Sequence, residues 1–91
     1  MKLLKASYYP NADVLYVEIG PDQPSYCELD PDGVVLRYSE EEGAPYGVTV
    51  VSLKKDWATR CAELYGKVAT FLEAPPADVE SAVVQAISAA S

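Results

Sequence analysis

The residues best suited to chemistry in this chain are carboxylates and tyrosines near its start. General acid–base catalysis needs two carboxylates, or a carboxylate with a tyrosine or lysine, that converge in a pocket. Asp13 with Tyr8 or Tyr16 is the pair that could do so, because a turn at Pro10 would bring two strand ends together. The alternative is structural: Asp13 accepts hydrogen bonds from turn amides, while Asn11 adopts the unusual dihedral angles. We favour the structural role.

Two further acidic groups do not form a ligand set. Residues 30–33, Asp-Pro-Asp-Gly, begin like the calcium loop of an EF-hand, but Val34 and Val35 occupy that loop's fifth and sixth positions. We therefore predict a turn, in which glycine is available for a positive φ. Residues 40–42 are three consecutive glutamates, and we expect them to form a solvated loop tip because adjacent side chains in a tip diverge.

The absence of histidine narrows the possible chemistry. It excludes Ser-His and Cys-His nucleophile systems and the usual zinc ligand sets. The two cysteines, Cys27 and Cys61, form no Cys-x-x-Cys pair, and we expect both to be small buried hydrophobes rather than a disulfide. We expect no catalytic residue, no metal and no cofactor, and we favour a protein that is not an enzyme over the alternative of a small enzyme.

The chain is acidic, with 14 acidic and seven basic residues and a net charge of −7. Residues 1–52 hold nine acids and three bases, whereas residues 53–91 hold five acids and four bases, so the negative field belongs to the first part. Nucleic-acid binding requires lysine and arginine to neutralise phosphates, so we expect no nucleic-acid partner. A charged protein partner would be basic. The alternative is that the acids only keep a small domain soluble.

The length and hydrophobicity indicate one globular domain. No run approaches the roughly 18 apolar residues of a membrane-spanning helix, and residues 1–5 lack the apolar core of a signal peptide. We expect a cytoplasmic protein that makes no use of a membrane.

The elements that must position these residues form an α+β domain. Residues 1–53 alternate with the two-residue period of strands, which predicts an antiparallel meander of four or five strands. The expected strands cover residues 2–9, 13–19, 25–30, 34–39 and 47–53. The predicted core face is apolar and consists of Leu4, Ala6, Tyr8, Leu15, Val17, Ile19, Cys27, Leu29, Val34, Leu36, Tyr38, Val48 and Val50.

Residues 54–91 change to a helical period and predict a two-helix C-terminal extension. Asp56 is the predicted N-cap of the first helix, whose apolar stripe runs from Trp57 to Leu72. Pro75 and Pro76 end that helix and open the second. A helix of this length is marginal alone, so its apolar stripe must pack on its own sheet or on another copy of the chain.

The predicted second face of the sheet is mixed rather than polar. It combines apolar and charged positions, namely Leu3, Tyr9, Val14, Tyr16, Val35, Thr49 and Val51 with Lys5, Glu18, Glu28 and Arg37. An exposed patch of this kind commonly marks an interface. We therefore predict a homodimer formed through this face or through the last helix. The predicted interface residues are Tyr9, Val14, Tyr16, Val35, Val51, Val83 and Ile87.

Three segments over residues 1–53 resemble a small prokaryotic family, the domain of unknown function 2283. They are Tyr-Tyr-Pro-Asn-Ala-Asp-Val-Leu-Tyr-Val at 8–17, Asp-Gly-Val-Val-Leu-Arg-Tyr at 32–38 and Gly-Val-Thr-Val at 47–50. The sequence departs from the family pattern where Tyr9, Arg37 and Ser39 replace acidic residues. The resemblance implies the strand order and a cytoplasmic prokaryotic protein, but no activity or catalytic residue. Some members are encoded beside small toxin-like proteins, which implies an antitoxin-like role.

Two functional hypotheses follow from the sequence. The first is a protein–protein association module that self-associates and neutralises a basic partner. The alternative is a small ligand-binding protein or enzyme with a site at the dimer seam, lined by tyrosines and Asp13.

Overall fold

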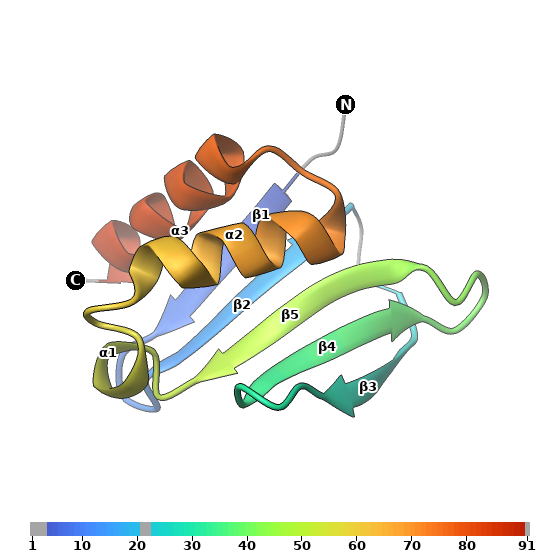
Figure 1. Cartoon of the computed structure of the whole chain (residues 1–91), viewed down its shortest axis with the longest axis horizontal. Helices are drawn as coiled ribbons and strands as arrows, with labels where there is room; N and C mark the ends of the chain where they lie inside the picture. The colour runs from blue at the N-terminus through green and yellow to red at the C-terminus, as the bar shows by residue number, and fades with distance from the viewer. Residues whose placement is uncertain (1–3, 21–22, 91) are drawn as a thin grey trace.

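The computed structural model of the chain describes residues 4–20 and 23–90, which form a sheet and three helices (Figure 1). The strands are β1 (Leu4–Tyr9), β2 (Val14–Ile19), β3 (Ser25–Leu29), β4 (Val34–Ser39) and β5 (Pro45–Val51). The helices are α1 (Leu53–Asp56), α2 (Cys61–Leu72) and α3 (Pro76–Ala90). The predicted α+β class is confirmed. The predicted Leu3 and the start of the first strand lie outside the described residues.

The strand order differs from the predicted meander. The order is β1-β2-β5-β4-β3 with every pair antiparallel, so β5 lies between β2 and β4. Neighbours in sequence are usually neighbours in a sheet, but β2 and β3 are not. The reason is chemical: β5 contributes the fully buried Val48 and Val50, whereas β3 is mostly exposed. The more apolar strand takes the central position.

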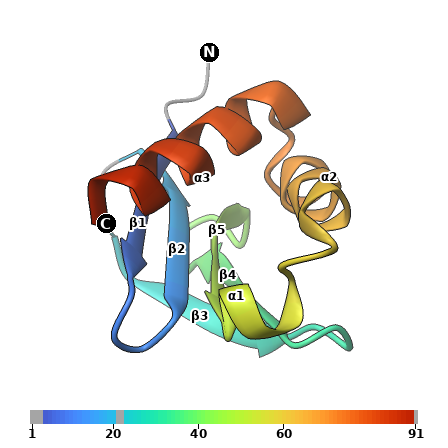
Figure 2. The same cartoon turned by 90° about the vertical axis from the view of Figure 1, so that its left-hand side faces the viewer.

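The sheet is covered by helices on one face only. In Figure 2, α2 and α3 lie on the same side of the curved sheet, and no helix lies on the other side. Side chains from the covered face pack with both helices in one core. Its buried members are Tyr8, Leu15, Val17, Val34, Val48, Val50, Leu53, Trp57, Leu64, Val68, Ala69, Leu72, Val79, Val83 and Ala86. We call the uncovered side the outer face.

The helical region begins one residue earlier than predicted and consists of three helices rather than two. Asp56 is the last residue of α1 rather than an N-cap, and the chain turns at Trp57 before α2 begins at Cys61. The two prolines act as predicted: α2 ends before them and Pro76 is the first residue of α3, where its missing N–H is not needed. The apolar stripe of α3 packs on the chain's own sheet, mainly on β1.

The alternation of β3 is the reverse of the prediction. Cys27 pairs with Arg37 and Leu29 pairs with Val35, so both lie on the outer face and both are exposed. Glu28, predicted to face outward, pairs with Leu36 on the helix side. A strand with a period of two exchanges all its side chains between faces when its phase is misassigned by one residue. The burial predicted for Cys27 is therefore wrong, and Cys61 is half-buried.

A charge inside the core should unfold the domain. Val17 is fully buried at the centre of the sheet, so Val17→Asp would bury a carboxylate without a partner. We expect a loss of more than about 4 kcal/mol, a large part of the stability of a domain of this size. Chemical denaturation followed by circular dichroism measures this loss. Val84→Asp at an exposed site on α3 is the control and should melt almost as the parent does.

Candidate functional site

Asp13 joins the turn between β1 and β2 to the start of the helical region. Its carboxylate accepts hydrogen bonds from the Tyr8 hydroxyl (2.6 Å to Oδ1), the Lys54 amide (3.0 Å to Oδ1 and 3.1 Å to Oδ2) and the Lys55 amide (3.3 Å to Oδ2). Its main-chain oxygen accepts from the Leu53 amide at 3.1 Å. We call these contacts the Asp13 clamp. They cap α1, whose own N-cap residue Ser52 makes no side-chain cap bond.

The clamp partly matches the structural prediction. Asp13 does bind Tyr8 and does accept bonds from backbone amides, but those amides belong to α1 rather than to the turn. Asp13 itself has the positive φ, at 55°, and Asn11 does not. Aspartate tolerates this left-handed conformation better than most residues.

The electrostatics of the pair are those of a structural contact. The hydrogen bond from Tyr8, followed by the bond from the Lys54 amide, lowers the pKa of Asp13. The same bond to Asp13 raises the pKa of Tyr8. A general base or acid works best with a pKa near the operating pH, whereas both groups here are shifted away from neutrality. The geometry therefore holds α1 in place and is poorly suited to proton transfer.

Tyr16, the other candidate partner of Asp13, lies on the outer face. It pairs with Ser7 and Thr49 in the sheet, and its ring packs edge to face against Tyr9 at 5.5 Å between centroids. The structure thus brings together Tyr8 and Asp13 and separates Tyr16 from them.

The outer face is built from rows of residues that run across the strands. The first row is Tyr9, Val14 and Val51; the second is Ser7, Tyr16, Thr49, Val35 and Leu29; the third is Lys5, Glu18, Gly47, Arg37 and Cys27. The first two rows are largely apolar, and Tyr9, Leu29 and Val51 are strongly exposed. Charged side chains are confined to the third row.

Glu18 and Arg37 of the third row form a polar network with Tyr46 that was not predicted from the sequence. Tyr46 is buried, and its hydroxyl donates to Glu18 Oε2 at 2.9 Å. Arg37 donates to the same oxygen at 3.2 Å and lies 5.3 Å from the centre of the Tyr46 ring. A Cβ at Gly47 would lie 2.6 Å from the main-chain oxygen of Val17, so glycine is needed for β5 to approach β2. Gly47, next to Tyr46, was the feature of the sequence that could have indicated this close approach of β5 to β2.

The predicted interface residues fall in two different environments. Five of them lie on the outer face: Tyr9, Val14, Tyr16, Val35 and Val51. Val83 is only 1% exposed and Ile87 packs against the same core, so the chain itself already covers them. Their participation in an interface with another copy is not supported by this placement.

The two acidic segments are organised as turns. Gly33 has a φ of 88°, and the Asp32 amide donates to Asp30 Oδ1 at 2.9 Å, as in a tight turn. Lys67 bridges Asp30 at 2.8 Å and Asp32 at 3.0 Å, and its hydrogen bond is the main cause of the lowered pKa of Asp30. Residues 40–42 form an exposed tip between β4 and β5.

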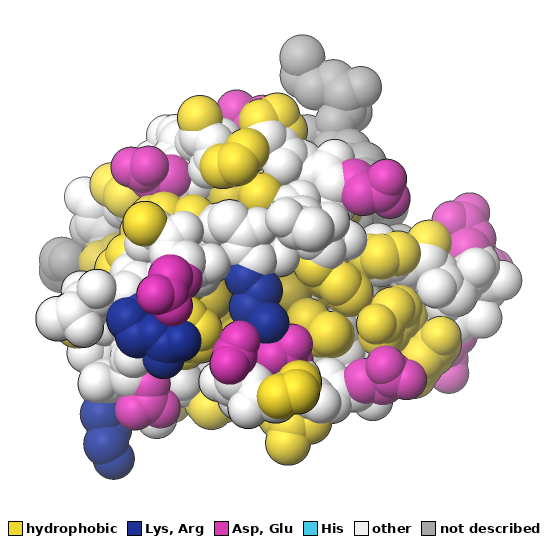
Figure 3. Space-filling view, viewed as in Figure 1, with side chains coloured by type: hydrophobic (Ala, Val, Ile, Leu, Met, Phe, Trp, Pro, Cys, Tyr) yellow, Lys and Arg dark blue, Asp and Glu magenta, His cyan; other side chains and the backbone are white. Residues whose placement is uncertain are grey.

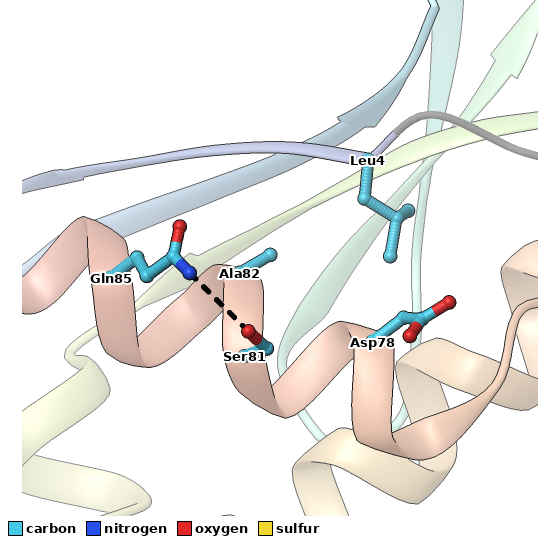
Figure 4. A pocket seen from close by; sticks show the side chains of 5 residues that line it. All are labelled: Leu4, Asp78, Ser81, Ala82 and Gln85. Carbon is cyan, nitrogen blue, oxygen red and sulfur yellow. Dashed lines mark hydrogen bonds between the residues drawn. The ribbon is translucent and has the colours of Figure 1, made fainter.

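Three surface hollows are open and shallow. One, of about 460 Å³, lies between α2 and β4 and includes Lys67 and Phe71; Figure 3 shows hydrophobic side chains gathered along this part of the surface. A second, of about 270 Å³, lies between β1 and α3 and includes Tyr8. The third, of about 230 Å³, is shown in Figure 4, where the Gln85 amide donates to the Ser81 hydroxyl at 3.4 Å. None of the three is lined by Asp13.

Two further observations concern the described residues as a whole. Within residues 4–20 and 23–90, no three cysteine, aspartate or glutamate side chains are grouped closely enough to hold a metal ion. Over the same ranges, every helix is too short or too polar to cross a membrane.

The Asp13 clamp should make stability depend on pH. Because folding lowers the pKa of Asp13, its contribution is complete above the ordinary aspartate pKa of about 3.9 and is lost as the pH falls toward the lower folded value. Asp13→Asn keeps a residue that tolerates positive φ but removes the charge. We expect it to be less stable than the parent at pH 7, with a difference that shrinks below pH 4. Urea denaturation at several pH values measures this difference.

Tyr8→Phe is the companion variant, since it removes the hydroxyl and keeps the ring. The Asp13 carboxyl should then titrate at a higher pH in an NMR titration, closer to its ordinary value. An unchanged Asp13 titration would show that the hydroxyl does not influence the carboxylate.

Comparison with known proteins supports the family resemblance. The sequence model of the family described as "Protein of unknown function (DUF2283)" matches residues 5–54, which include all five strands except Leu4, together with the first two residues of α1. The match ends before α2 and α3, as the sequence predicted. No curated protein and no solved structure matches the chain. Because the match takes in more than half of its 91 residues, the chain belongs to the DUF2283 family.

Proposed function

We propose that this protein is a non-enzymatic association module that binds a second copy of itself through the outer face of its sheet. The observation that carries the proposal is the half-covered sheet: helices bury one face, and the other presents two largely apolar rows. Antiparallel sheets can leave one face in water, but that face is normally polar. An apolar face of this kind is typical of an interface.

Charge favours a second copy over a basic partner at this face. Among the described strands, the outer face carries Lys5 and Arg37 against Glu18, so two positive charges meet one negative charge on a chain with a net charge of −7. Two such faces can approach with little of the repulsion expected between acidic molecules. A basic partner would find no acidic surface there.

An antitoxin-like interaction with a basic protein is the second candidate, and the exposed Glu40–Glu42 tip is the feature that favours it. Binding at the tip should weaken steeply as salt is raised, because solvent-exposed charges are screened. Replacing the three glutamates with glutamine should abolish it and leave self-association unchanged. Co-expression with the product of a neighbouring gene, followed by co-purification of both chain types, tests this candidate. The cytoplasmic location and prokaryotic origin stay predictions.

A pair of matched valine substitutions tests the outer face. Val51 is 46% exposed on the outer face and Val84 is 52% exposed on α3, so each can be changed to glutamate at nearly equal exposure. Val51→Glu places like charges opposite each other in a face-to-face assembly and should lower the mean mass measured by light scattering. Val84→Glu adds the same charge elsewhere and should not.

Two light-scattering results would contradict parts of this proposal. If the unsubstituted chain has the mass of a single 9.8 kDa molecule at tens of micromolar, self-association is wrong. If it associates but Val51→Glu leaves the mass unchanged, the outer face is not the contact surface.

A further inference from the structure

The free edge of β3 has a backbone pattern that can pair with itself. The β3–β4 register continues into hydrogen bonds at both ends, from the Asp30 amide to the Val34 oxygen (2.8 Å) and from the Glu40 amide to the Pro24 oxygen (3.1 Å). Hydrogen-bonded and non-hydrogen-bonded pairs alternate along an antiparallel ladder. The even-numbered residues of β3 therefore bond to β4. The odd-numbered ones, Ser25, Cys27 and Leu29, direct their N–H and C=O groups away from it.

No described element receives these groups. β3 is the last strand in the sheet order, and in Figure 1 no helix or strand is drawn beyond its free side. The other edge strand, β1, is different, because it carries Lys5 and lies beside α3. Covering elements and charged residues, lysine above all, are common protections of a sheet edge. β3 has no lysine, and its one charged residue is Glu28.

We propose that β3 pairs antiparallel with β3 of a second copy and so joins two sheets into one of ten strands. This extends the proposed self-association to a second surface, the edge, which is distinct from the outer face. Pairing with Cys27 opposite Cys27 of the second copy places each Ser25 opposite Leu29. The backbone N–H and C=O groups of Ser25, Cys27 and Leu29 that point away from β4 then all form hydrogen bonds with the second copy. They do so in three residue pairs, each with two hydrogen bonds.

Side chains favour this register over its neighbours. It places Tyr26 opposite Glu28 of the second copy, so no like charges face each other within the strand. In the next possible register in either direction, only two hydrogen-bonded pairs form between Ser25, Cys27 and Leu29 of the two copies, instead of three. One of those shifts also places Glu28 opposite Glu28, which is destabilising. In this register the side chain of Leu29, 75% exposed in the single chain, has Ser25 of the second copy opposite it on the outer face.

The edge and the outer face can be used together. Antiparallel edge pairing has its two-fold axis perpendicular to the sheet and keeps both outer faces on the same side. A face-to-face contact has its two-fold axis in the plane of the sheet. If these perpendicular axes meet, they generate a closed tetramer of two ten-stranded sheets, the symmetry most common among tetramers.

Amide hydrogen exchange measured by NMR tests the edge directly. It is done on Val51→Glu, which removes the outer-face contact, at tens and at hundreds of micromolar. We expect exchange at Ser25, Cys27 and Leu29 to slow by at least about tenfold at the higher concentration, since amides gain protection when they acquire an acceptor. Tyr26 and Glu28, bonded within the chain, serve as internal controls and should change little.

Cys27→Pro is the matched variant. It removes an N–H that the chain itself does not use, and proline is tolerated on an edge strand in that orientation. In the Val51→Glu background it should lower the mass from two chains to one.

Two results would overturn the edge pairing: exchange at the three amides that does not depend on concentration, or a single-chain mass for Val51→Glu at hundreds of micromolar. Either would leave the outer-face proposal intact, because that proposal rests on the fall in mass from the unsubstituted chain to Val51→Glu. If Val51→Glu does not fold, the exchange experiment on the unsubstituted chain decides, since face-to-face packing supplies no acceptors for these amides.

Discussion

The contact on which the arrangement of the helices depends is the Asp13 clamp. The carboxylate holds a tyrosine hydroxyl from β1 and two amides of α1, residues that lie five and about forty positions away. It therefore ties the start of α1, directly after β5, to the turn between β1 and β2. A charged acceptor suits this task, since hydrogen bonds to an ionised group are stronger than neutral ones. From this end of the sheet the chain continues into α2 and α3, which lie over one face (Figure 2).

Covering one face creates the asymmetry that we connect with function. The chain has enough helix to bury a single side of its sheet, and the core is complete without a second copy, as the burial of Val83 shows. The outer face and the β3 edge are left for other contacts. One offers apolar side chains and the other offers backbone hydrogen bonds, so the two surfaces differ in chemistry and in the symmetry that they impose.

Much of the fold was accessible from the sequence because local rules govern it. The two-residue alternation located all five strands to within two residues of their observed ends, over the part of the chain that the structure describes. Proline marked the start of α3, and glycine marked the turn at Gly33. Prediction failed where the local sequence pattern was weak, or where the deciding contact is with a residue far away in the chain. Cys27 and Leu29 were assigned to the core because they are apolar, yet the β3–β4 register places both on the outer face, which no described helix covers. Asp56 looked like a helix cap, but the cap comes from Asp13, far away in the sequence.

The sequence by itself determined the fold class, the strand segments and the family, and it left open whether Asp13 meets Tyr8 or Tyr16. The fold class and the strand segments depend on interactions between residues close in the chain. The family depends on sequence motifs that can be recognised without the structure. Only the tertiary structure decided that β5 enters between β2 and β4, that Asp13 caps α1, and that Glu18, Arg37 and Tyr46 meet. These contacts join residues separated by up to 42 positions, and many strand pairings satisfy the same alternation. The choice among them is made by the free energy of packing the whole core at once.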